Sequence, residues 1–121
     1  MKTRLAKSTL LTVAAIAAFL IHPVTAAAPT RLVTQRDFAS AVKFAGPGRR
    51  LVFVEFMNPA CPHCQAFEKA VLTSTAFISY ANASLSVVIS DLTDKTAMPA
   101  DLLALVREHS VDGTPTILVF D

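Results

Sequence analysis

Residues 51–64, LVFVEFMNPACPHC, contain the pattern that decides the fold. The first seven are apolar except for Glu55, with β-branched and aromatic side chains among them, which is typical of a strand buried on both faces. Asn58-Pro59-Ala60 then ends the strand, and Cys61-Pro62-His63-Cys64 opens a helical pattern. The sequence therefore predicts a central strand that leads directly into a helix beginning at a pair of cysteines.

Strands and helices alternate on either side of this unit. Apolar residues at helical spacing predict helices over residues 35–44, 61–82 and 100–109. The middle helix is expected to be interrupted near residues 73–75, and Thr34 with Asp37 forms a weak capping box before the first. Further strands are predicted over residues 85–89 and 116–120. This order predicts an α/β fold with a mostly parallel sheet flanked by helices, because parallel neighbours need crossover connections.

The composition is that of one globular domain. The chain has 121 residues, of which 53% are hydrophobic and 17% charged, so it is neither disordered nor collagen-like. Two cysteines are too few for a disulfide-stapled miniprotein, and they cannot by themselves complete a four-ligand zinc site. Any cysteine chemistry must therefore be carried by this single pair.

The N-terminus has the pattern of a signal peptide. Lys2, Arg4 and Lys7 precede an apolar run over residues 10–21, and small residues follow at 24–28. We expect residues 1–26 to be a cleaved signal and residues 27–121 to be the domain. An uncleaved membrane anchor is the alternative, but a bilayer core needs about 20 apolar residues. Residues 27–121 contain 8 basic and 9 acidic residues, a net charge of −1. This charge does not favour binding to nucleic acid or to anionic membranes.

The cysteine pair has the spacing and the context of a redox site. Residues three apart at a helix start lie on one face, within the separation that a disulfide accepts. Cys61 would stand at the helix N-terminus, where free backbone N–H groups favour a thiolate, so it is the expected nucleophile. Pro62 suits the first helical turn, and His63 would add a donor or a positive charge near the thiolate.

Cys64 is the expected resolving thiol, and Glu55 its expected proton acceptor. Cys64 lies one turn inside the helix and must lose its proton to attack a mixed disulfide. Glu55 is the one carboxylate in a strand that is otherwise apolar, where it is costly unless it has a partner or a task.

Each of these residues also has a plainer interpretation. The cysteines would serve as a structural disulfide or as half of an intermolecular zinc site, His63 as a solvated helix residue, and Glu55 as a solvated or salt-bridged charge. Asn82-Ala83-Ser84 matches a glycosylation sequon, which carries little weight without a eukaryotic host.

With these residues in place, the chain resembles the thioredoxin-like superfamily from about residue 31 to residue 121. The resemblance rests on LVFVEF, on an acidic residue six before the first cysteine, on CPHC at a helix start, and on VDGTPT before ILVF. CPHC itself is similar to the active site of the periplasmic DsbA oxidants. The longer stretch CPHCQAFEKAVLTSTAF, with VDGTPTILVFD, is more similar to the C-terminal domain of the DsbD reductases.

The resemblance implies a thioredoxin-like fold, with a central mixed sheet between helices, and a function. It implies a cis Pro115 against the active-site cysteines and a Thr114 that helps bind the substrate backbone. It also implies that the thioredoxin-like domain continues past Asp121 with a further strand and helix. We therefore expect the sequence to be C-terminally incomplete, as an uncovered apolar last strand also indicates.

The function expected is that of an exported, periplasmic thiol-disulfide oxidoreductase, with the reductase direction slightly favoured. Its partners would be protein thiols or disulfides and a membrane electron-transfer protein. It would need neither a metal nor a cofactor beyond the redox-active disulfide Cys61–Cys64. The alternative is a thioredoxin-like binding module without catalysis, or an inactive truncated fragment. Nothing in the sequence indicates an oligomeric state.

Overall fold

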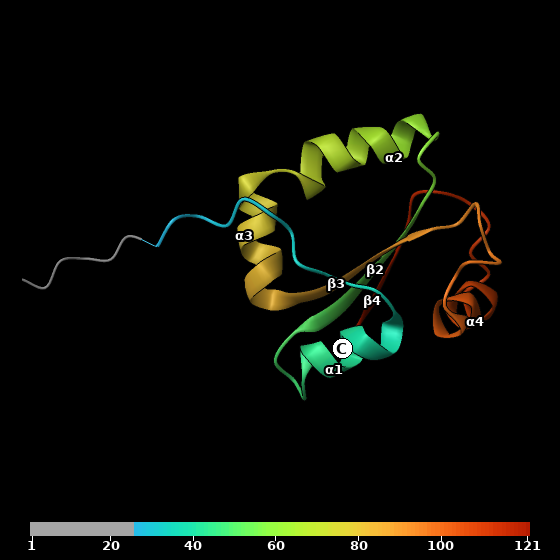
Figure 1. The fold of residues 1–121 in the computed structure, drawn as a ribbon, viewed down its shortest axis with the longest axis horizontal. Coiled ribbons are helices and arrows are strands. Elements are labelled where there is room, and N and C mark those ends of the chain that lie inside the picture. The colour runs from blue at the N-terminus through green and yellow to red at the C-terminus, as the bar shows by residue number, and fades with distance from the viewer. Residues whose placement is uncertain (1–25) are drawn as a thin grey trace, which may run out of the picture.

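The computed structural model describes residues 26–121 and places one sheet between helices (Figure 1). The elements in chain order are β1 (Thr34–Gln35), α1 (Phe38–Ala45), β2 (Leu51–Met57), α2 (Pro62–Phe67), the π-helical turn η1 (Glu68–Leu72), α3 (Thr75–Ser84), β3 (Leu85–Asp91), α4 (Ala100–Glu108) and β4 (Thr116–Phe120). Apart from Ala26, the expected signal peptide lies outside the described residues and stays a prediction. Within residues 26–121, none of the helices is long and apolar enough to cross a membrane.

The sheet is mixed, with the strand order β1-β3-β2-β4. β3 runs parallel to both β1 and β2, and β4 runs antiparallel to β2 with Glu55 opposite Ile117. The predicted strand over residues 51–57 is an inner strand, buried along five consecutive residues. The α/β class and the mixed sheet between helices are therefore confirmed, with β4 as the antiparallel member.

The beginning of the domain differs from the sequence-based prediction. Residues 34–35 are not helical but form the short strand β1, which pairs with Val87 and Val88. The helix begins at Phe38 because Asp37 is extended and its side chain accepts a hydrogen bond from the Ser40 N–H at 2.7 Å. The capping residue is thus Asp37, and the predicted Thr34 box does not form.

The long helix after the cysteines is interrupted, as predicted. The π-helical turn η1 widens it at residues 68–72, and it breaks at Thr73 and Ser74. The Ser74 hydroxyl then caps α3 by accepting a hydrogen bond from the Phe77 N–H at 3.2 Å. The break turns the chain so that α2 and α3 cover different parts of the same sheet face (Figure 1).

The two faces of the sheet pack against different helices, because side chains alternate along β2. Val52, Val54 and Phe56 pack with residues of α1 and α4 in the larger core cluster. Phe53 points the other way and packs with Ala81 of α3 and Val87 of β3. Glu55, two residues from Phe53, therefore faces the side on which α2 and α3 lie.

β4 borders the sheet in the described part of the chain, pairing only with β2. Ile117 and Val119 on its α2 and α3 side are 39% and 54% exposed.

Candidate active site

Cys61 stands directly before the first residue of α2. Its backbone is extended, with φ −79° and ψ 120°, and Pro62 occupies the first helical position, where a missing N–H costs nothing. The Cys61 N–H donates to the Asn58 carbonyl at 3.0 Å, and the Cys61 carbonyl accepts from the Gln65 N–H at 3.1 Å. The thiol is thus held at the end of the helix where free N–H groups gather.

The pKa of the Cys61 thiol is lowered from its ordinary value. The largest cause is a hydrogen bond from the backbone N–H of Cys64, and the Cys64 side chain and the backbone N–H of His63 add to it. Partial desolvation acts against them. A lowered pKa favours the thiolate of Cys61, which is the form of a cysteine that attacks disulfides.

The turn before β4 lies against Cys61. The Thr114–Pro115 peptide bond is cis, the isomer that the resemblance implies. The Cys61 thiol lies 3.6 Å from the Thr114 carbonyl oxygen, and Thr114 itself is partly exposed. The structure thus brings Cys61 and Thr114 together from positions 53 residues apart.

Cys64 is buried beneath this surface. It is 1% exposed, and its sulfur accepts a hydrogen bond from the Asn58 N–H at 3.5 Å. Both cysteines are free thiols in this structure. One sulfur is therefore reachable by a partner and the other only from within the protein.

Glu55 is buried in the sheet and is 1% exposed. Among residues 26–121, it has no oppositely charged partner, and its Oε2 atom has no hydrogen-bond partner. Burial raises the pKa of Glu55 above its ordinary value, and the negative charge of Glu68 raises it further. Of the plainer interpretations, a solvated or salt-bridged Glu55 is therefore wrong.

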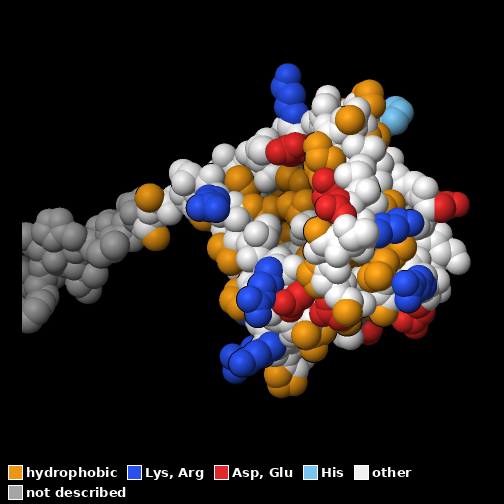
Figure 2. All heavy atoms as spheres, turned by 45° about the vertical axis from the view of Figure 1, so that its right-hand side comes forward, with side chains coloured by type: hydrophobic (Ala, Val, Ile, Leu, Met, Phe, Trp, Pro, Cys, Tyr) orange, Lys and Arg blue, Asp and Glu red, His pale blue; other side chains and the backbone are white. Residues whose placement is uncertain are grey.

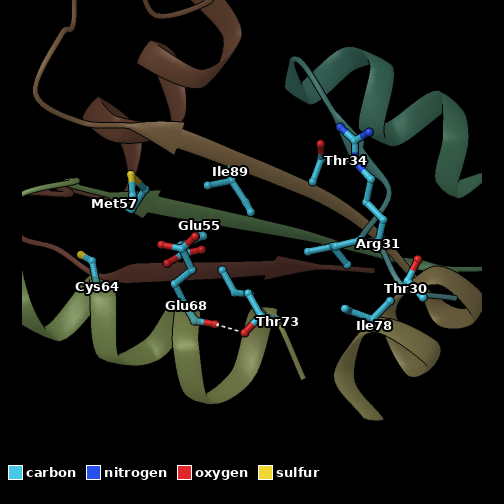
Figure 3. A pocket seen from close by; sticks show the side chains of 12 residues that line it. Thr30, Arg31, Thr34, Glu55, Met57, Cys64, Glu68, Thr73, Ile78 and Ile89 are labelled. Carbon is cyan, nitrogen blue, oxygen red and sulfur yellow. Dashed lines mark hydrogen bonds between the residues drawn. The ribbon is translucent and has the colours of Figure 1, made fainter. Parts of the chain in front are cut away.

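Glu55 and Cys64 line the same cavity, which has a volume of about 310 Å³. Figure 3 shows the side chains of Glu55, from β2, and Glu68, from the helical segment after Cys64, reaching toward one another in it. Most of the other walls are apolar. Figure 2 shows apolar side chains in a hollow beside the N-terminal segment, with acidic side chains at its edge.

Two residues of this site were not predicted from the sequence. Glu68 lies four residues after Cys64, a spacing that places both on one helical face, so the pattern contained a signal for it. Asn58 contributes through its backbone N–H, which no side-chain pattern could reveal.

His63 lies at the surface, and the effect of its side chain on the Cys61 thiolate stays a prediction. Its side chain is exposed and makes no hydrogen bond within residues 26–121, while its backbone N–H is among the groups that lower the pKa of Cys61. Within the same residues, no three His, Cys, Asp or Glu side chains are grouped as metal ligands would be.

Comparisons with known proteins agree with this architecture. The model of a family described as a thioredoxin-like domain matches residues 38–121, so the chain belongs to that family. A DsbH oxidoreductase structure superposes with a TM-score of 0.64 at 18% identity, covering 94% of this chain and 74% of its own. A thioredoxin structure from Thermus thermophilus superposes with a TM-score of 0.57 at 24% identity, covering 75% of this chain and 65% of its own. No curated protein matches the sequence significantly.

Proposed function

We propose that this thioredoxin-like chain is an exported thiol-disulfide oxidoreductase that acts on protein disulfides through Cys61 and Cys64. The observation that carries the proposal is the contrast between the two thiols. Cys61 is partly exposed with a lowered pKa, whereas Cys64, one turn further on, is 1% exposed. An accessible thiolate with a shielded thiol behind it is the arrangement that two-step disulfide exchange requires.

In the first step, the Cys61 thiolate attacks one sulfur of a substrate disulfide. The substrate S–S bond breaks, a mixed disulfide forms with Cys61, and the other substrate sulfur leaves as a thiolate. Thr114 borders Cys61, so an extended substrate segment would lie along the Thr114–Pro115 turn.

In the second step, Cys64 attacks the Cys61 sulfur of the mixed disulfide. The second substrate thiolate leaves, and the Cys61–Cys64 disulfide forms, so that two electrons pass to the substrate. Glu55 is the proposed acceptor of the Cys64 proton, because it lines the same cavity and its Oε2 is unpartnered. A raised pKa suits a group that must take up a proton near neutral pH.

We propose the reductase direction, with a periplasmic location and a membrane dithiol protein that re-reduces the pair. The longer sequence resemblance to the DsbD C-terminal domain favours it over oxidation.

Trapping of the mixed disulfide tests the function. Cys64→Ser, incubated with a disulfide-containing protein such as insulin, should accumulate an adduct on Cys61 that dithiothreitol removes. Cys61→Ser is the matched control and should form none. Exchange by a folded Cys61→Ser protein at the parent rate would overturn the proposal. A folded parent chain without any exchange would favour the alternative, a binding module or an inactive fragment.

A further inference from the structure

A short N-terminal segment forms one wall of the cavity that contains Glu55. This segment, residues 30–34, is called the strap below. Thr30, Arg31, Leu32 and Thr34 all line the cavity opposite the helical segment. Figure 1 shows the strap passing α3 before it enters the sheet. At the end of the strap, Thr34 of β1 pairs with Val87 of β3. Leu32 packs against the core cluster that contains Phe53.

Asn82 of α3 fastens the strap by two hydrogen bonds. Its Oδ1 accepts from the Val33 N–H at 2.9 Å, and its Nδ2 donates to the Arg31 carbonyl at 2.9 Å. A carboxamide is suited to this task because it offers an acceptor and a donor side by side. Asn82 does not line the cavity and has no hydrogen bond to either cysteine.

The charged and titratable groups around Glu55 are few. Glu68 faces it from the helical segment and Cys64 from α2, while β3 and β4 present Ile89 and Ile117. Arg31, on the strap, turns its guanidinium away from the two carboxylates (Figure 3). The strap thus contributes to the surroundings of Glu55 by excluding water rather than by adding charge.

We propose that Asn82 is a positioning residue that, by clamping the strap, holds one wall of the cavity against solvent beside Glu55 and so sets the pH range in which Glu55 accepts the proton of Cys64. This inference rests on the proposed function. Opening the strap would admit water to a carboxylate whose ionised form is disfavoured by burial.

The first readout is the release of the strap, measured by limited trypsin digestion. Trypsin cuts after Arg31, whose carbonyl is the group that Asn82 holds. In Asn82→Ala this cut should be about tenfold faster, which corresponds to about 1.4 kcal/mol for two hydrogen bonds together. Ser84→Ala, on the same helix and without a side-chain hydrogen bond to the strap, is the matched control and should be cut at the parent rate.

The deciding readout is the titration of Glu55 itself, followed by carboxyl ¹³C NMR on the full chain. Asn82→Ala should lower the pKa of Glu55 toward its ordinary range and move the acid limb of the exchange rate to lower pH. Leu32→Ala, which loosens the strap while leaving Asn82 intact, should act in the same direction if Asn82→Ala does not fold. An unchanged Glu55 titration in a variant whose strap is released would overturn the proposal. Because the titration needs no turnover, a failure of the proposed exchange activity would be seen separately in the parent chain.

Discussion

The two faces of the sheet differ in packing and in polarity. On the α1 and α4 face, Val54 and Phe56 are completely buried among apolar neighbours. On the α2 and α3 face, the same strand presents Glu55 to a cavity of about 310 Å³. One strand therefore contributes a close-packed face and a hollow, acidic face in alternate residues.

The difference shows where the protein gives up stability. A buried carboxylate without a partner and an unfilled cavity both cost free energy relative to apolar packing. Both lie beside Cys64, the thiol that we propose loses its proton to Glu55. Packing on the α1 and α4 face stabilises β2, and this stability offsets the cost of the buried Glu55 and of the cavity on the other face.

The largest effect is expected from breaking the packed face. Phe56→Ala should reduce the free energy of unfolding by about 3–5 kcal/mol, because Phe56 is fully buried and the cavity left behind cannot collapse completely. Urea denaturation followed by circular dichroism measures it. Val119→Ala, on the exposed part of the other face, should change stability by less than about 0.5 kcal/mol. Equal losses in the two variants would contradict the division between the faces.

Glu55→Gln removes the carboxylic acid of the hollow face while keeping the shape of the side chain. The rate of disulfide exchange should fall by about 100-fold, the lower end of what a positioned general base contributes. The free energy of unfolding, in contrast, should be higher in Glu55→Gln than in the parent at neutral pH. Because burial raises the pKa of Glu55, the parent loses stability as pH rises from about 4.3 through that raised value, and the variant should lack this loss.

Unfolding measured between pH 4 and pH 8 checks the second part of this expectation. A variant whose stability falls with pH as steeply as that of the parent would show that Glu55 is not the titrating group.

The smallest effect is expected at the rim of the hollow. Glu68→Gln removes the charge that raises the pKa of Glu55, so Glu55 should ionise at lower pH. Exchange on the acid limb of the profile should become about twofold to fivefold faster, the scale of single exposed charges. Glu108→Gln, at the end of α4, is the control and should leave the profile in place. If the acid limb of the Glu68→Gln profile moved to higher pH, the charge of Glu68 would not be what raises the pKa of Glu55.

The sequence predicted the packed face better than the hollow one. The apolar run at residues 51–57 and the helical spacing after Cys61 depend on local pattern, and both elements appear where the pattern places them. β1 was missed because two residues have no periodicity, and its strand character comes from pairing with β3. That pairing is a tertiary effect, which outweighs local preference.

The candidate site was predicted as far as residue type and spacing allow. Glu55 was identified because a lone carboxylate in an apolar strand is unusual, but its lack of a partner depends on what surrounds it in space. The clamp by Asn82 joins residues 49 and 51 positions apart, and no local pattern contains such a contact. The roles of Cys61, Cys64, Thr114 and Pro115 in catalysis remain proposals.

The most direct test of the central claim is the reduction potential of the Cys61–Cys64 pair in the parent chain. The chain is equilibrated in dithiothreitol or glutathione redox buffers, and the fraction of closed disulfide is measured after alkylation of free thiols. We expect the Cys61–Cys64 disulfide to close reversibly, with a potential near that of thioredoxin, about −270 mV. A value near that of DsbA, about −120 mV, would contradict the reductase direction. A folded protein whose pair does not close reversibly would contradict the claim that these two cysteines are a redox site.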